Sequence, residues 1–218
     1  MAVSKDQLVK IFPKAPNPDA LVVALNAAMV KFSLTTKLRQ ASYLSQTGHE
    51  SGGYTSVREG LNYKVEALNS LFSNRMTPAD AAKYGRIDGK QAANQEMIAN
   101  IIYGGDWGRK NLGNTQVGDG FKFRGRGYLQ ITGRANYQAC GIALDIDLIS
   151  NPEQLELPQY AALSAAWFFS KNSQLMAFVD KGDNLNVGSI VNTGGPGKTP
   201  LGADDRKAIY DAAMQLAA

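Results

Sequence analysis

Apolar residues recur at helical spacing through most of the 218-residue chain, and this pattern constrains the fold more than any other feature. Residues 18–32 form one such segment, with Asn17 or Asp19 as a suitable start. Residues 35–51 form the next, and it should end at Gly52-Gly53 because glycine is common just after a helix. The pattern predicts a mainly α protein.

Further segments carry the start and stop signals of helices. In residues 77–85, Thr77 is a suitable N-cap, Pro78 suits the first turn and Gly85 marks the end. Residues 157–172 are apolar on most sides, which predicts a buried central helix. Helices are also expected over residues 90–105 and 202–218.

A glycine-rich stretch at residues 105–137 interrupts the helical pattern. Within it, residues 121–132 contain aromatic and β-branched residues that suit extended backbone, and we expect a short hairpin or an irregular strand pair there. A long glycine-rich loop in a helical protein is often functional. We expect one catalytic domain over residues 1–218, with a possible small helical lobe at residues 75–104.

The chain has one cysteine, Cys140, and one histidine, His49. One cysteine cannot form an intramolecular disulfide. Zinc sites usually need three or four ligands, so a histidine-rich zinc site is excluded and we expect neither a metal nor a cofactor. The net charge of +4 fits either an ordinary soluble protein or one with an anionic partner. No motif indicates nucleic acid.

The first residues bear on where in the cell the protein is found. Lys5, Asp6 and Lys10 leave no apolar run of signal-peptide length. No stretch reaches the roughly 20 apolar residues of a membrane helix. We therefore expect no signal peptide, no stable membrane insertion and a cytoplasmic protein.

Glu50 and Glu59 lie on either side of the Gly52-Gly53 pair. On one straight helix they would be about 13 to 14 Å apart along the axis. A chain that turns at the glycines can bring them to the roughly 6.5 to 9.5 Å that inverting glycosidases need. Spacing alone favours the alternative that both are ordinary surface acids.

Four blocks in order then resemble glycoside hydrolase family 19, which contains plant-type chitinases and bacteriophage endolysins. They are QTGHESGG with REGLNY, FKFRGRGYLQITGRANY, SIVNTGG and DDRKAIYDAA, within residues 38–210. The short interval between the two glutamates is similar to the endolysin branch. The resemblance implies a lysozyme-like, two-lobed helical fold with a substrate cleft.

The resemblance also implies roles for particular residues. Glu50 matches the general acid, Glu59 the general base and Thr132 the hydroxyl residue that holds the attacking water. The substrate site would further include Gln130, Asn136, Asn192 and Arg206, the last of which supports the carboxylates.

For several other residues, two roles remain open. Tyr63 could stack on a sugar, although buried aromatic residues are commoner. Arg124 and Arg126 could hold loops or contact substrate, and His49 could pack or act. Ala135 replaces the family's aromatic residue before Asn136.

We therefore expect a monomeric endolysin that hydrolyses the β-1,4 bond between N-acetylmuramic acid and N-acetylglucosamine in peptidoglycan glycan strands. It would stay in the host cytoplasm until a holin gives it access to the periplasm and cell wall. A chitinase is the first alternative, because chitin presents the same N-acetylated ring. A catalytically idle wall-binding module is the second.

Overall fold

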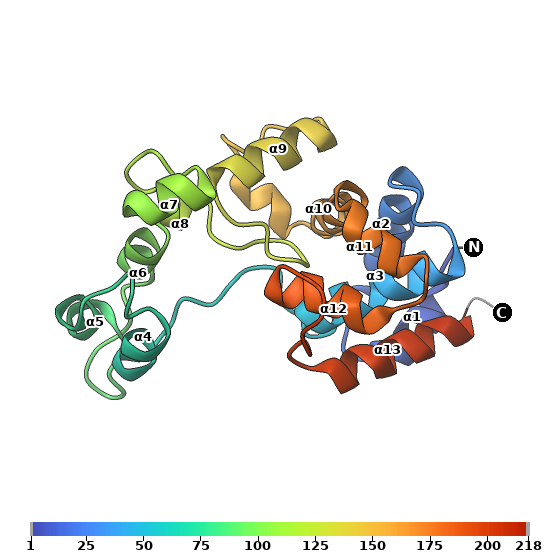
Figure 1. Ribbon diagram of the computed structural model, residues 1–218, viewed down its shortest axis with the longest axis horizontal. Helices are drawn as coiled ribbons and strands as arrows, with labels where there is room; N and C mark the ends of the chain where they lie inside the picture. The colour runs from blue at the N-terminus through green and yellow to red at the C-terminus, as the bar shows by residue number, and fades with distance from the viewer. Residues whose placement is uncertain (1, 217–218) are drawn as a thin grey trace. The chain divides into compact units, whose positions relative to one another are not determined.

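The computed structural model describes residues 2–216, which divide into two compact units. Unit 1 comprises Met1–Val57, Gly127–Leu129 and Gln154–Ala218, and unit 2 comprises Arg58–Arg126 and Gln130–Glu153. Within residues 2–216, the secondary structure is helical apart from isolated bridges between single residues (Figure 1). No helix in that range has the length and apolar character needed to cross a membrane.

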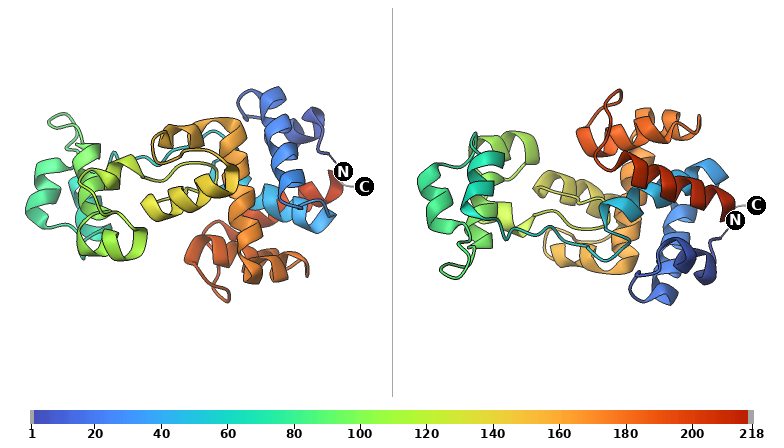
Figure 2. Two further views of the ribbon diagram at one scale, coloured as in Figure 1. Left: turned by 90° about the horizontal axis from the view of Figure 1, so that it is seen from above. Right: turned by 90° about the horizontal axis from the view of Figure 1, so that it is seen from below.

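Unit 1 is built from two pairs of packed helices. Helix α3 packs against α13, and α2 packs against α10, while the shorter helices fill the space beside these pairs (Figure 2). The helices are α1 (Lys5–Ile11), α2 (Pro18–Lys31), α3 (Lys37–Glu50), α10 (Pro158–Lys171), α11 (Ser173–Val179), α12 (Asn184–Thr193) and α13 (Ala203–Leu216). Their buried faces form one hydrophobic core.

The ends of these helices follow the signals in the sequence. Asn17 caps α2 through a hydrogen bond from Ala20, and Thr36 caps α3 through one from Arg39. Helix α3 ends at Glu50, after which Gly52 and Gly53 have φ values of 58° and 73°. The predictions for residues 18–32, 35–51 and 157–172 are confirmed. Residues 217 and 218 of the last predicted helix lie outside the described residues.

Unit 2 is built from shorter helices around a smaller core. They are α4 (Val65–Leu71), α5 (Pro78–Tyr84), α6 (Gln95–Ile102), α7 (Gly105–Leu112), α8 (Asp119–Lys122) and α9 (Arg134–Leu144). The 3₁₀ helix η1 (Pro152–Glu156) follows α9 and contains residues of both units. Leu68, Ile98 and Ile102 are fully buried in the core of unit 2. Residues 75–104, the possible small lobe, lie within this unit.

The helix predicted over residues 90–105 is wrong at both ends. It begins at Gln95, because the preceding residues form a turn in which the Gln91 side chain donates to the carbonyls of Ala82, Lys83 and Gly85. Those carbonyls belong to the end of α5, so Gln91 satisfies groups that a helix terminus leaves open. At the other end, Gly105 starts α7 instead of a loop.

Of the hairpin or irregular strand pair predicted over residues 121–132, the regular hairpin is wrong and the irregular pairing is confirmed, because Arg126 and Ile131 exchange two backbone hydrogen bonds in an isolated antiparallel bridge. The described residues contain no regular strand there, and the ladder is limited to isolated bridges from Arg126 to Ile131 and to Arg58. The glycine-rich stretch instead holds α7, α8 and the start of α9, whose ends lie at Gly113, Gly118 and Gly133, all with positive φ. Glycine there supplies helix ends rather than a long loop.

Candidate active site

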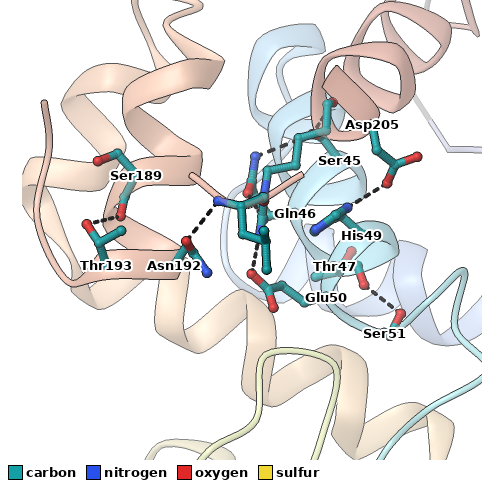
Figure 3. Close-up of polar contacts among 12 residues, drawn as sticks. Ser45, Gln46, Thr47, His49, Glu50, Ser51, Ser189, Asn192, Thr193 and Asp205 are labelled. Carbon is teal, nitrogen blue, oxygen red and sulfur yellow. Dashed lines mark hydrogen bonds and ion pairs between the residues drawn. The ribbon is translucent and has the colours of Figure 1, made fainter. Parts of the chain in front are cut away.

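Glu50 is the last residue of α3, and its carboxylate accepts a hydrogen bond from the guanidinium of Arg206 on α13 (Figure 3). The Glu50 side chain is 26% exposed, whereas that of Arg206 is 2% exposed. The pairing of α3 with α13 therefore brings together two residues that are 156 positions apart in the sequence. The exposed part of the carboxylate remains able to meet a ligand.

The other donors of Arg206 are directed to protein groups. Its Nη1 donates to Gln46 Oε1 at 2.5 Å, and its Nε donates to the carbonyl of Leu201 at 3.0 Å. Gly188 packs closely on its side chain, since a Cβ there would lie 3.1 Å from Arg206 Cδ. Arg206 thus lies behind Glu50 and positions its carboxylate, which agrees with the predicted support of the carboxylates, while a direct contact with substrate stays a prediction.

His49 forms a second connection between α3 and α13. Its Nδ1 lies 2.5 Å from Asp205 Oδ2, one position before the Glu50 and Arg206 pair on each helix (Figure 3). Gly202 packs against the imidazole, where any Cβ would overlap the ring. His49 therefore helps to hold the end of α3, which carries Glu50, against α13.

Asn192 lies near the end of α12 and is exposed. Its Oδ1 accepts a hydrogen bond from the backbone N–H of Leu201 at 3.0 Å, and the carbonyl of Leu201 in turn accepts from Arg206. Ser189 holds the same loop through Gly195 and Lys198. Asn192 is therefore linked through Leu201 to Arg206, which holds Glu50. The exposed side of Asn192 can still contact a ligand.

Glu59 lies in unit 2, and each of its carboxylate oxygens has a donor. The N–H of Gly125 donates to Oε1 at 2.6 Å, and the hydroxyl of Tyr103 donates to Oε2 at 2.7 Å. The backbone N–H of Glu59 also donates to the carbonyl of Gly125 at 3.0 Å. The two donors fix the orientation of the carboxylate without placing a positive charge on it.

Thr132 and Gln130 lie beside Gly125. A Cβ on Gly125 would be 2.7 Å from Gln130 Oε1 and 3.3 Å from Thr132 Oγ1, so a side chain there would have to displace the Gln130 amide. The Thr132 hydroxyl donates to the carbonyl of Gln130 at 2.9 Å, which leaves its oxygen available as an acceptor. Asn136 donates to the carbonyl of Thr132 at 2.8 Å. Unit 2 thus brings together Glu59 and the predicted residues Gln130, Thr132 and Asn136.

Tyr63 is partly buried in the same unit. Its ring meets that of Phe72 edge-on, with centroids 5.3 Å apart. Burial, together with the negative charge of Glu59, raises the pKa of Tyr63 above its ordinary value. The phenol is therefore protonated at neutral pH and close enough to Glu59 to sense its charge.

Arg126 and Arg124 have structural roles in unit 2. Arg126 is 4% exposed and donates to the carbonyl of Lys122 and to the hydroxyl of Tyr137. The Tyr137 hydroxyl donates to the carbonyl of Arg124, whose own guanidinium donates to the carbonyl of Phe121. These contacts favour the reading in which both arginines hold the glycine-rich segment in place.

No protein-family model matches the chain. A curated relative from Haemophilus influenzae (strain ATCC 51907 / DSM 11121 / KW20 / Rd), described as a glycosyl hydrolase family 19 domain-containing protein, is 39% identical over 140 residues. The match covers 64% of this chain and 64% of the relative. Over these 140 residues the chain is similar to a glycoside hydrolase family 19 domain.

A second curated relative matches over a shorter stretch. Chitinase 8 of Oryza sativa subsp. japonica is 42% identical over 48 residues, which is 22% of this chain and 18% of the rice protein. In both cases the chain spans less than two thirds of the relative's length.

Solved structures of chitinases share the fold. Chitinase C from Streptomyces griseus HUT6037 superposes with a TM-score of 0.61 at 18% identity, covering 99% of this chain and 76% of that one. A bacterial family 19 chitinase superposes with a TM-score of 0.55 at 24% identity, and the superposition covers 100% of this chain and 95% of that one. The class IV chitinase of Zea mays superposes with a TM-score of 0.58 at 15% sequence identity. The superposition covers 99% of this chain and 92% of the maize chain. The prediction of a mainly α, lysozyme-like family 19 fold is confirmed.

Sequence reasoning did not find Tyr103, Gly125 or Gln46, which contact the predicted residues directly. Tyr103 is 44 positions from Glu59, and no periodicity connects them. Gly125 lies inside the FRGRGYLQIT block, so the block gave a signal for it. Gln46 begins the QTGHESGG block, which could have drawn attention to it.

Among residues 2–216, no three histidine, cysteine, aspartate or glutamate side chains gather as metal ligands would. The functional groups that the structure offers are two supported carboxylates, one in each unit. The donor to Glu50 is the guanidinium of Arg206, whereas the donors to Glu59 are a backbone N–H and a phenol hydroxyl.

Proposed function

We propose that this chain is a phage-type endolysin, which hydrolyses the β-1,4 bond between N-acetylmuramic acid and N-acetylglucosamine in bacterial peptidoglycan with inversion at the anomeric carbon. The observation that carries the proposal is the Glu59 arrangement: a carboxylate oriented by two neutral donors, with the Thr132 hydroxyl beside the same glycine. A general base for water needs this combination of an ionised acceptor and a second group to hold the water.

In the proposed reaction, water attacks the anomeric carbon while Glu59 accepts its proton. The bond from that carbon to the leaving oxygen breaks, and Glu50 gives its proton to this oxygen. Thr132 accepts a hydrogen bond from the water, and Gln130, Asn136, Asn192 and Tyr63 are proposed to bind the sugar rings. The role of Glu50 comes from its match to the family block and from the exposed side of its carboxyl group.

Charge supports peptidoglycan as the substrate. The chain has a net charge of +4 and a pI of about 9.1, which favours association with an anionic wall over neutral chitin. The curated relative that matches over 140 residues comes from a bacterium. We further propose that the protein acts as a monomer, binds no nucleic acid, and remains in the host cytoplasm until a holin opens the path to the periplasm.

A chitinase is the second candidate. The rice relative is named a chitinase, and so are the solved proteins that share the fold. Chitin and peptidoglycan both contain N-acetylated glucosamine rings, so the same residues would serve either polymer.

Parallel assays separate the candidates. Purified protein is added to Gram-negative cells stripped of their outer membrane, to isolated peptidoglycan and to chitin oligosaccharides. We expect clearing of the cells, new reducing ends from peptidoglycan and an inverted first product by proton NMR. Hydrolysis of chitin alone would favour the chitinase, and no hydrolysis of either polymer would reject both.

The same assays test the two carboxylates. Glu50→Gln and Glu59→Gln should each lower activity by at least about 100-fold, because each removes a proton-transfer group. Glu59→Gln should keep the melting temperature nearly unchanged, since glutamine keeps the shape of the side chain, whereas Glu50→Gln should lower it without loss of folding, because buried Arg206 loses its anionic partner. The exposed Glu153→Gln is the matched control and should keep full activity. Loss of folding in Glu50→Gln would give that residue a structural role instead.

A further inference from the structure

We propose that Tyr103 is a positioning residue for the reaction, which aims the carboxylate of Glu59 through its phenol hydroxyl. This inference rests on the proposed role of Glu59 as general base. It adds a residue that the sequence motifs did not include and that lies outside all four family blocks.

The hydrogen bond from Tyr103 is one of two that determine how Glu59 is oriented. Its 2.7 Å bond to Oε2 and the 2.6 Å bond from Gly125 to Oε1 reach the carboxylate from separate segments, the end of α6 and the loop after α8. With the Gly125 bond alone, the carboxylate could rotate about its terminal torsion, which has a broad, soft energy profile. The Tyr103 hydroxyl removes this freedom.

Tyr103 is itself held in place. Its backbone N–H donates to the carbonyl of Ala99 at the end of α6, and its own carbonyl accepts from the Asn114 side chain at 2.9 Å. Gly108 packs so tightly on this carbonyl that a Cβ would collide with it. Asn114 is 6% exposed and also accepts a hydrogen bond from the N–H of Arg134. The phenol therefore projects from a backbone that is tied to α7 and α9.

The chemistry of the phenol suits a base. Burial, and then the negative charge of Glu59, raise the pKa of Tyr103 well above its ordinary value. The hydroxyl consequently remains a neutral donor at every working pH. A guanidinium in the same place would hold the carboxylate more strongly but would also oppose the uptake of a proton.

The kinetic test uses Tyr103→Phe, which removes only the hydroxyl. We expect kcat to fall about 10- to 100-fold because the base is misaligned, while KM stays within about twofold because Tyr103 does not touch substrate. Tyr84→Phe, in a partly buried tyrosine on α5, is the matched control and should keep wild-type kinetics. A kcat equal to that of the control would overturn the proposal.

A double variant tests whether Tyr103 acts through Glu59. Glu59→Gln combined with Tyr103→Phe should be no slower than Glu59→Gln alone, because the positioned group is already gone. Losses that multiply would show that Tyr103 acts independently of Glu59, and the proposal would fail.

An NMR measurement does not depend on activity. In protein labelled at the tyrosine Cζ carbons, the Tyr103 signal is identified by its absence in Tyr103→Phe. We expect Glu59→Gln to shift this signal, since the charged acceptor is removed, and Glu153→Gln to leave it in place. An unmoved signal would overturn the proposal. A wild-type protein inactive on both polymers would reject the proposed function, and the NMR result would still decide whether Tyr103 holds Glu59.

Discussion

At the scale of single residues, ion pairs in this protein differ according to burial. The Glu50 and Arg206 pair and the Asp119 and Arg134 pair each contain one side chain that is 2% exposed, so each needs its partner. The pair between Arg109 and Asp106 lies in solvent, with side chains 67% and 94% exposed. Mutation of a buried pair should therefore change the free energy of unfolding strongly, whereas mutation of a solvent-exposed pair should change it little.

Asp119 should make stability depend on pH. Burial opposes its charge, but hydrogen bonds from Arg134, Gln116 and Thr115 outweigh burial and hold the pKa of Asp119 below its ordinary value. A folded pKa below the unfolded one means that the stabilisation is present above about pH 4 and is lost as pH falls through the folded pKa.

The variant Asp119→Asn should therefore lower the free energy of unfolding by about 3 kcal/mol at pH 7, because Arg134 loses its buried partner. Urea unfolding at pH 7 and pH 3 measures this, and the difference from wild type should shrink at pH 3. Asp106→Asn is the control and should change stability by less than about 0.5 kcal/mol. An equal effect at both pH values would contradict the assignment.

At the scale of elements, local signals predicted some helices well and others poorly. Helices α2, α3, α5 and α10 have caps or prolines at their starts and long apolar patterns, so residues near in sequence determine them. Helices α7 and α8 consist of short segments between glycines, and their stability depends on packing against the rest of unit 2. Such short helices are marginal alone, which explains why the sequence indicated a loop.

The cap of α3 provides a prediction at this scale. Thr36→Ala should lower the free energy of unfolding by about 1 kcal/mol, because the N–H of Arg39 loses the acceptor 3.3 Å away. The adjacent exposed Thr35→Ala is the control and should change it by less than about 0.5 kcal/mol. Thermal unfolding followed by circular dichroism compares the two. Equal losses in both variants would mean that the cap contributes little.

At the scale of the whole molecule, the chain passes repeatedly between two units that each have a hydrophobic core. Unit 1 consists of three separate segments, including both ends of the described chain. Glu50, Asn192 and Arg206 belong to unit 1, while Glu59, Tyr63, Gln130, Thr132 and Asn136 belong to unit 2. The predicted site residues are therefore divided between two separately stabilised bodies.

Separate cores predict separate responses to core mutations. Leu68→Ala removes a fully buried side chain from the core of unit 2 and should cost about 3 kcal/mol. We expect amide hydrogen exchange to accelerate mainly in Arg58–Arg126 and Gln130–Glu153. Leu25→Ala, in the core of unit 1, is the matched variant and should give the opposite distribution. Uniform acceleration in both variants would show that the units unfold together.

The sequence by itself determined the helical class, the caps of the long helices, the break after Glu50 and the resemblance to glycoside hydrolase family 19. These follow from local patterns and motifs, which do not depend on distant contacts. Only the tertiary structure decided what supports the two glutamates. The pairing of α3 with α13 buries Arg206 behind Glu50, and the end of α6 brings Tyr103 to Glu59. Those partners are 156 and 44 positions away, and side-chain packing rather than sequence spacing selects them.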